Sequence, residues 1–196
     1  NPRTDKLTTN SWGSEIDTKR YEISAKLGYV NPEIPWQSVG VQAAFSGHKQ
    51  ESYFGLNQYD ILQNSLYANV IYNSIISDSR HKIKTGISYT YDHYDEFVNT
   101  TNYERTETSV GAFFEYNYDN LDNLILSAGL RIDHHNLLET FITPRFHVKY
   151  TPWETGTFRV SAGRGKKSAA IFAENQWLFG TNRTLKITNN NGEYYG

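Results

Sequence analysis

The stretch FITPRFHVKYTPW, residues 141–153, decides the fold because polar and apolar side chains alternate along it. Arg145, His147 and Lys149 occupy odd positions, and the even positions between and after them are apolar. A period of two residues is typical of a β-strand, so the two sets lie on opposite faces. In a soluble protein the apolar face would pack into a core. In an outer-membrane barrel the apolar face contacts lipid, and the charged face lines the lumen.

Seven further segments alternate in the same way, so the chain is predicted to be all-β with about eight strands. The expected strands cover about 19–30, 37–49, 62–73, 81–97, 104–118, 124–135, 143–150 and 157–165. Helical turns are expected only within 168–179. Consecutive strands joined by local turns indicate an antiparallel meander.

The predicted connections alternate in length along the chain. The short connections are rich in Asn, Asp, Pro and Gly, and they cover 31–37, 74–79, 119–123 and 151–156. The longer polar segments cover 47–61, 97–104, 134–142 and everything after 166. Short turns at one end of the strands and longer loops at the other are typical of outer-membrane barrels, whereas β-sandwiches have irregular loop lengths.

Aromatic residues are abundant, with 15 Tyr, 10 Phe and 4 Trp among 196 residues. Beside the short connections lie Tyr29, Trp36, Tyr72, Tyr116, Tyr118, Tyr150 and Trp153. On the apolar face toward the longer segments lie Tyr21, Tyr89 and Tyr91. This pattern predicts two aromatic girdles around an aliphatic band, as in a transmembrane β-barrel. We therefore expect the apolar face to contact lipid.

Composition excludes several classes of protein. The net charge of −2 gives no reason to expect a nucleic-acid partner, and the absence of Cys excludes thiol catalysis and disulfides. No apolar run approaches the length of a membrane helix. No nucleophile motif occurs, so we expect no enzymatic activity and no cofactor.

The face opposite the apolar band is expected to line a lumen. Its candidate residues are Arg131, Asp133, Arg145, His147, Lys149 and Arg159. Counting back from the turns places Asp133 opposite Arg145, a plausible ion pair. The same count places Lys149 opposite Arg159, a like-charge pair that is unfavourable unless a carboxylate reaches it. We therefore expect an acidic partner inside the lumen.

Ligand contact is expected from aromatic and histidine side chains near the longer segments, because such rings suit a large polar ligand. The candidates are Tyr53, Phe54, Tyr59, His93, Tyr94, Tyr103, His134 and His135. Asp, Glu and His together also suit a divalent metal. Solvated polar side chains at an aqueous rim explain these histidines better, so no metal site is predicted.

Four motifs carry a resemblance to a known family. They are GLRIDHHN (129–136), TPRFHVKY (143–150), TFRVSAGRG (157–165) and AEN (173–175). In this order and spacing they resemble the barrel of TonB-dependent outer-membrane receptors, particularly those of Bacteroidetes-type bacteria. The resemblance covers 80–196 well and the start more loosely. Lys166 and Lys167 depart from the aromatic and Arg usual in the family, which weakens inference about the ligand rather than the fold.

The resemblance implies a barrel of about 22 strands closed by a plug domain. Family members import scarce nutrients such as ferric siderophores or cobalamin with energy transmitted by TonB. Residues 1–196 would then be an internal part of the barrel, without the plug and the terminal strands. The implied partners are outer-membrane lipid, the plug of the same parent chain, the TonB system through that plug, and a small-molecule nutrient. The implied location is the bacterial outer membrane, and the plug would supply acids to Lys149 and Arg159.

Two alternatives remain open at this point. One is a soluble β-sandwich or small barrel that binds a carbohydrate or another ligand, which would stay monomeric in plain buffer. The other is a self-contained eight-strand outer-membrane barrel, which would need its last strand to pair with its first. The tail TNNNGEYYG (188–196) is a poor candidate for a closing strand.

Overall fold

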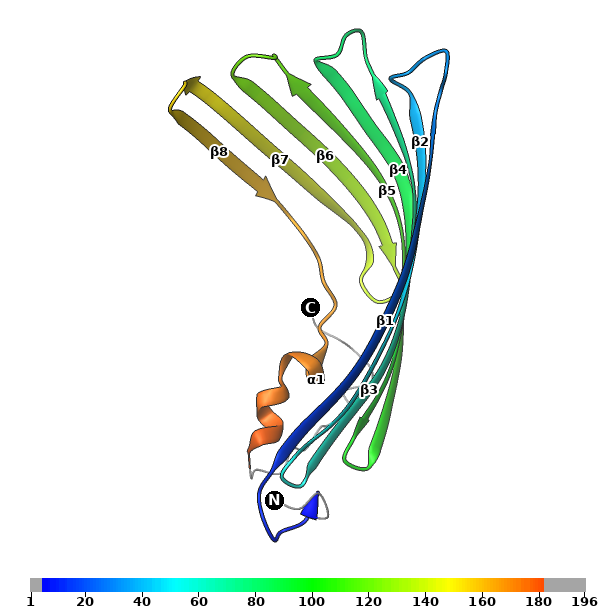
Figure 1. The fold of residues 1–196 in the computed structure, drawn as a ribbon, viewed down its shortest axis with the longest axis vertical. Coiled ribbons are helices and arrows are strands. Elements are labelled where there is room, and N and C mark those ends of the chain that lie inside the picture. The colour runs from blue at the N-terminus through cyan, green and yellow to red at the C-terminus, as the bar shows by residue number, and fades with distance from the viewer. Residues whose placement is uncertain (1–4, 182–196) are drawn as a thin grey trace.

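The computed structural model describes residues 5–181, which form one sheet of eight antiparallel strands followed by two short helical turns (Figure 1). The elements are β1 (Ser14–Val30), β2 (Ser38–Phe54), β3 (Asn57–Ile75), β4 (His81–Val98), β5 (Thr101–Asp119), β6 (Leu124–His135), β7 (Glu139–Trp153), β8 (Gly156–Gly163), α1 (Ile171–Glu174) and η2 (Gln176–Gly180). Each strand pairs with the next one in the chain, so the predicted all-β antiparallel meander is confirmed.

The two rims differ from the prediction at one end. The short connections lie close to their predicted positions, at 31–37, 76–80, 120–123 and 154–155, and we call this end the short-turn rim. The predicted long loops are wrong, because β2 and β3 continue to a turn at 55–56, and β4 and β5 continue to a turn at 99–100. These polar segments keep their backbone ladder, so they resemble loops only in composition. We call this end the hairpin rim.

The connection between β6 and β7 is also shorter than predicted, covering only 136–138. Gly55 and Asn99 adopt positive φ angles of 62° and 54° at the two tighter turns of the hairpin rim. Glycine and asparagine tolerate this conformation, so the hairpins can reverse within two residues. The hairpin rim therefore consists of long hairpins rather than irregular loops.

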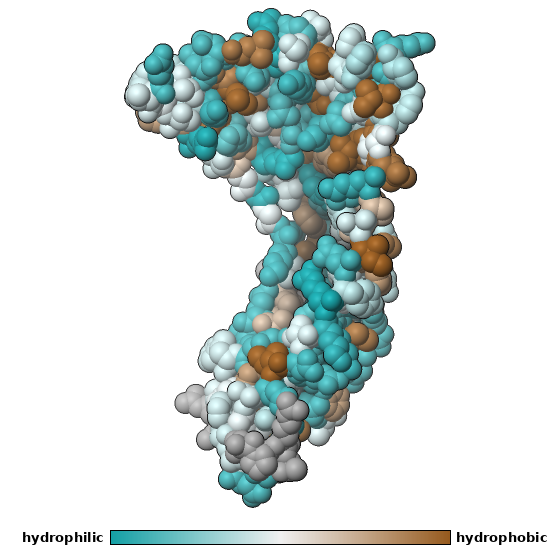
Figure 2. Space-filling view, in the orientation of Figure 1, coloured by the Kyte–Doolittle hydropathy of each residue, from teal (hydrophilic) through white to brown (hydrophobic). Residues whose placement is uncertain are grey.

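The convex face of the sheet is apolar. The register places Val41, Val70 and Ile87 in one row across β2, β3 and β4, and Ile132 and Ile142 continue that row into β6 and β7. Aliphatic side chains on this face stay exposed, as in Leu27 at 76%. Figure 2 shows hydrophobic residues along the convex edge and mainly hydrophilic ones beside the hollow. Covering one such side chain is worth about 1.5–3 kcal/mol, so an uncovered band of this kind is unfavourable in water.

Aromatic side chains flank this band at both ends. At the short-turn rim Tyr29, Trp36 and Trp153 are more than half exposed. Tyr116 and Tyr118 pack beside His81, with ring centroids 6.0 and 5.1 Å away. Toward the hairpin rim Tyr21 and Tyr89 are also exposed on the convex face.

The concave face carries the hydrophobic core of the described residues, which consists of Tyr59, Ile61, Val98 and Phe179. After β8 the chain turns back across this face, and α1 lies against the hollow side of the sheet near the hairpin rim (Figure 1). We call residues 164–181 the returning segment. Its α1 and η2 confirm the short helical turns predicted within 168–179.

A β-sandwich would require a second packed sheet, whereas residues 5–181 form a single one. Within this range β1 pairs only with β2 and β8 only with β7, so the sheet is not closed on itself. No helix in the described part of the chain has the length and apolar character needed to cross a membrane. The tail at 188–196, judged above as a closing strand, lies outside the described residues.

Candidate functional site

The concave face brings together most of the candidate residues. Strand register places Phe54, Tyr59, Tyr94, Tyr103 and His135 on this face. The six predicted lumen residues share it through β6, β7 and β8. The sheet therefore collects on one wall two groups of residues that are distant in sequence.

Three candidate ligand residues lie on the opposite, convex face. Tyr53 has the Lys6 ammonium 5.3 Å from its ring centroid. His93 contacts Thr106 at 3.0 Å, and His134 contacts Thr140 at 2.9 Å. The structure thus separates these three residues from the concave group.

An aromatic cluster occupies the concave face near the hairpin rim. Tyr59 is fully buried and stacks on Phe179 with 5.3 Å between centroids. The ring centroid of Phe172 lies 6.1 Å from that of Tyr59 and 5.0 Å from that of Tyr103. Phe54 and Tyr94 complete the cluster at its edge. The returning segment therefore covers the aromatic part of the wall with two of its own rings.

Phe172 and Phe179 are functional-site residues that the sequence did not predict. Their partners on β3 lie more than a hundred positions away, so no local pattern identifies the contact. The one available signal is their spacing of seven residues within SAAIFAENQWLF, which places both on one side of a helical turn.

Polar groups frame the aromatic cluster. The Tyr59 hydroxyl donates to Glu96 Oε1 at 2.8 Å, and Glu96 is itself buried. Asn57 Nδ2 donates to the Phe179 carbonyl oxygen at 2.9 Å. Buried polar groups stabilise a fold only when they are paired, so these bonds fix where the returning segment rests.

A buried ion pair on β5 contacts the first part of the returning segment. Arg105 Nε lies 2.8 Å from Glu107 Oε1, with side-chain exposures of 10% and 7%. The Arg105 guanidinium also stacks 4.4 Å above the Tyr94 ring and donates to the Ala169 carbonyl oxygen at 3.2 Å. Glu107 accepts a hydrogen bond from Ser168. Neither Arg105 nor Glu107 is among the residues predicted from the sequence.

Closer to the short-turn rim the wall becomes basic. Arg131 forms an ion pair with Asp133, in which Nε donates to Oδ2 at 2.7 Å. Its Nη2 also donates to Ser88 Oγ at 2.7 Å. Arg145 forms an ion pair with Glu115 on β5. Arg131 therefore has partners on its own strand and on β4, and Arg145 has its partner on β5.

The predicted pairing of Asp133 with Arg145 is wrong. The register places Asp133 beside Phe141 and Arg145 beside Gly129. The count failed because the β6–β7 hairpin is longer, and its turn tighter, than the sequence suggested. The predicted position of Lys149 opposite Arg159 is confirmed.

Glycines form the floor beneath these side chains. Gly86, Gly111 and Gly129 lie on the concave face of β4, β5 and β6. Phe113 covers Gly86, and a Cβ added at Gly129 would lie 2.8 Å from Arg145 Nε. Arg131 and Asp133 lie over Gly111 in the same way. The absence of Cβ atoms lets these long side chains lie flat across the neighbouring strand.

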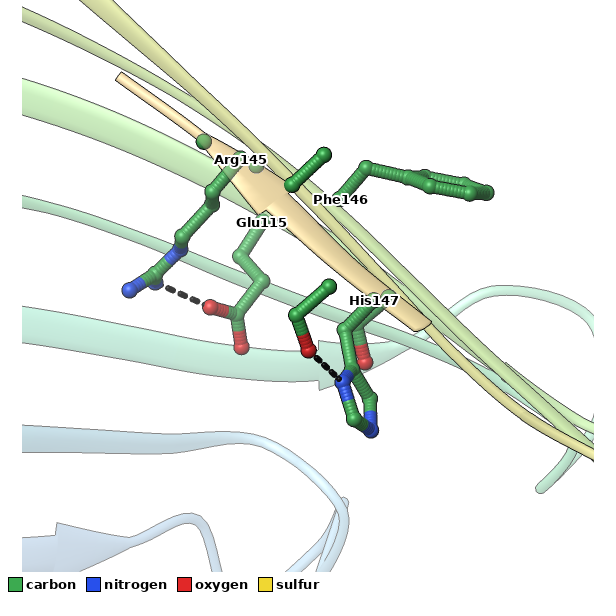
Figure 3. Close-up of a pocket in the computed structure, with 9 residues that line it drawn as sticks. Glu115, Arg145, Phe146 and His147 are labelled. Atoms are coloured by element: carbon green, nitrogen blue, oxygen red, sulfur yellow. Dashed lines mark hydrogen bonds and ion pairs between the residues drawn. The ribbon is translucent and has the colours of Figure 1, made fainter. Parts of the chain in front are cut away.

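Two clefts open above this floor. The first has a volume of about 480 Å³ and contains Glu115, Arg145, His147 and Ser161. Figure 3 shows Arg145 and Glu115 facing each other, His147 pointing the same way, and Phe146 on the other side of the strand. His147 Nδ1 lies 2.7 Å from Ser161 Oγ. The second cleft, of about 390 Å³, adjoins it through Arg145.

Lys149 and Arg159 lie still nearer the short-turn rim. Neither forms an ion pair with another residue in the range 5–181. Lys149 shares a cleft of about 310 Å³ with Asp119 and Asp122. This part of the wall therefore presents two adjacent cations to whatever lies inside the hollow.

Electrostatic effects outside the strands are local. At the short-turn rim, hydrogen bonds from Arg80 lower the pKa of Asp78 to about 2. On the returning segment, a hydrogen bond from Lys167 lowers the pKa of Glu174. Across residues 5–181, no cluster of three or more His, Asp or Glu side chains is arranged to hold a metal ion.

Comparison with protein families gives a match over almost the whole chain. The family described as TonB dependent receptor-like, beta-barrel, matches residues 1–194. A search of curated proteins finds none that matches the chain.

Proposed function

The chain belongs to the TonB-dependent receptor-like β-barrel family, and from this premise we propose that it forms part of an outer-membrane receptor that imports a scarce nutrient. This family consists of outer-membrane receptors and transporters rather than enzymes. The observation that carries the proposal is the two-faced sheet, with an exposed aliphatic band on one side and a charged, glycine-floored wall on the other. Such a sheet suits a barrel wall between lipid and an aqueous lumen.

We propose that the convex face contacts outer-membrane lipid. Leu27, Ile23 and Ile87 are each at least 60% exposed there. The aromatic residues at both ends of the band suit the two membrane interfaces. The location would be the bacterial outer membrane, with the hairpin rim outside the cell.

We further propose that residues 1–196 are part of a larger barrel that also contains a plug domain. The free edges of β1 and β8 within the described range can each accept another strand. The adjacent cations Lys149 and Arg159 suit carboxylates on a plug packed inside the lumen. TonB would act through that plug.

The ligand would enter from the hairpin rim. Of the candidate residues, Phe54, Tyr59, Tyr94, Tyr103 and His135 face the hollow and are the ones we retain. Tyr53, His93 and His134 face outward, which argues against their direct contact with a ligand inside the lumen. We propose a ferric siderophore, cobalamin or a similar large nutrient as the ligand, as is typical of the family.

The test begins with the folding of the complete reading frame that encodes this chain. Expressed in outer membranes, it should migrate faster in a detergent gel before heating than after, as closed barrels do. A soluble monomer in plain buffer would contradict the membrane-barrel hypothesis and favour a soluble ligand-binding module. Uptake of labelled ferric siderophores and cobalamin should then be compared between cells with and without the gene, and with and without TonB. Uptake that does not depend on the gene would overturn the transport role.

A further inference from the structure

We propose that the second concave cleft is a binding site for a small organic anion that also carries a hydroxyl group, that is, a hydroxycarboxylate. This inference rests on the proposed function only in that it takes the concave face to be an aqueous lumen. The site is the 390 Å³ cleft bordered by Lys84, Arg131, Arg145, Arg164 and Asn69, and we call it the basic cleft.

The charge of the basic cleft is unbalanced. Four cationic side chains line it, and no carboxylate does. Arg131 and Arg145 have carboxylate partners, Asp133 and Glu115, that stand outside the lining. The other two cations have no carboxylate at hydrogen-bonding distance in the described range.

Those two cations are Lys84 and Arg164. Lys84 Nζ lies 3.9 Å from the nearest Glu115 oxygen, too far for a charge-assisted hydrogen bond. The guanidinium of Arg164 forms no ion pair with any residue that the structure describes. An anion in the basic cleft would be attracted by both, and Arg131 and Arg145 line the same cleft.

Asn69 supplies an independent sign of a ligand. It is 92% buried on the wall of the basic cleft, since only 8% of its surface is exposed. Its Nδ2 donates to the Tyr67 hydroxyl at 2.6 Å, but its Oδ1 has no hydrogen-bond donor in the range 5–181. Buried acceptors in folded proteins are nearly always hydrogen-bonded to a donor. A carboxylate cannot donate, whereas a hydroxyl on the same molecule can.

The glycine floor makes the site rigid before any ligand arrives. Arg131 lies over Gly111 and is fixed by Asp133 and Ser88, and Arg145 lies over Gly129 and is fixed by Glu115. Guanidinium groups that existing partners already hold in place recognise carboxylates at low cost in conformational entropy. The volume is at the small end of the range for ligand sites, which suits a compact acid.

The experiment compares malate with succinate, two dicarboxylates that differ by one hydroxyl. The full-length protein, purified in detergent at constant ionic strength, is titrated with each acid in a calorimeter. We expect malate to bind about fivefold more tightly than succinate, the ratio that one additional hydrogen bond supplies. Asn69→Leu should abolish this difference.

Charge variants test the other half of the site. Arg164→Gln and Lys84→Gln should each weaken malate binding about tenfold, whereas Lys149→Gln, on the same wall but outside the basic cleft, should change it less than twofold. The gel mobility test confirms that each variant is folded. An equal loss in all three variants would overturn the site, because it would indicate unspecific attraction to a basic wall.

Two further outcomes would overturn the proposal without touching the transport role. One is that neither acid binds the wild-type protein at millimolar concentration. The other is that malate binds only after the plug is deleted, which would assign the cleft to a plug carboxylate instead. In both cases gene-dependent uptake of a nutrient would still support the proposed function, so the two failures can be distinguished.

Discussion

Two regions of the concave wall, one on β3 and β4 and the other on β7 and β8, differ in how their side chains are covered and paired. Near the hairpin rim, Tyr59 and Val98 are buried under the returning segment, and Tyr59 is hydrogen-bonded to Glu96. Near the short-turn rim, Lys149 and Arg159 face the hollow without an ion pair in the described range. One region is covered by the chain itself, while the other leaves two neighbouring cations facing the hollow. An aromatic cluster can be covered by any ring, whereas paired cations require a specific opposite charge.

The largest effect is expected where the wall is closed. Tyr59→Ala should lower the free energy of unfolding by about 3–5 kcal/mol, because it removes a fully buried ring and leaves Glu96 without its donor. Thermal unfolding in detergent measures this. Tyr53→Ala is the matched control, with the same change on the same hairpin but on the convex face, and should cost about 1 kcal/mol or less. Equal losses would mean that the two faces do not differ in packing.

The buried ion pair should give the next largest effect. Glu107→Gln should destabilise the fold by about 2–3 kcal/mol, since Arg105 would be left with little solvent and no full charge partner. Tryptic cleavage after Lys166 and Lys167 should become faster as the returning segment detaches. Arg20→Gln breaks an exposed pair on the concave face of β1 and should cost less than about 1 kcal/mol. Unchanged cleavage in Glu107→Gln would show that the pair does not hold the segment.

At the open end, charge matters more than packing. Lys149→Glu should reduce assembly of the barrel with its plug and lower nutrient uptake, because it reverses one of two adjacent cations. Lys149→Arg keeps the charge and should behave like the wild type. Folded barrel per cell and initial uptake rate are the measurements. If Lys149→Glu assembles and transports normally, the acidic partner proposed for this end does not exist.

The glycine floor between the two ends predicts a smaller effect. Gly129→Ala should lower stability by about 1 kcal/mol, because the new Cβ displaces Arg145 from its position beside Glu115. Gly28→Ala has no atom within 4 Å of the added Cβ and should be neutral or slightly stabilising. Melting temperatures of the two variants distinguish these cases, and a shared direction of change would contradict a packing role for Gly129.

The smallest effect lies in a turn of the short-turn rim. Hydrogen bonds from Arg80 hold the pKa of Asp78 at about 2, below its ordinary value of 3.8. A lowered pKa in the folded state stabilises the fold fully above pH 4 and progressively less as the pH falls toward 2. The stability difference between wild type and Asp78→Asn should therefore shrink between pH 5 and pH 2. A difference that stays constant over this range would show that the Asp78 carboxylate does not contribute through its charge.

Local alternation predicted much of this molecule. The sixth strand was predicted at 124–135, the range in which it is found, and the eight-strand meander follows from the same period. Alternation also carried information about Tyr53 that was not used, because its odd position in β2 matches Val39 and Val41 on the convex face. Side-chain facing is local, so it can be obtained from sequence wherever the strand has no bulge.

Other features depend on distances that no local pattern contains. The long hairpins of this rim could not be predicted, because polar strands have the same composition as loops. The partners of Asp133 and Arg145 were missed because register depends on the turn at 136–138. The packing of Phe172 on Tyr59 joins residues more than a hundred positions apart, and only the folded chain reveals it.

The glycine floor has a mechanical consequence. Backbone hydrogen bonds join each strand only to its immediate neighbours. Arg145 passes over Gly129 to link β7 with β5, and Arg131 passes over Gly111 to link β6 with β4. Each link crosses one strand: the Arg145 link runs straight across a row of the register, and the Arg131 link runs diagonally to the row of Ser88. They add side-chain contacts between strands that are not adjacent, and these contacts would have to break, together with the backbone ladder, if the strands slid past one another. A wall braced in this way can stay rigid while a force is applied to something moving inside it.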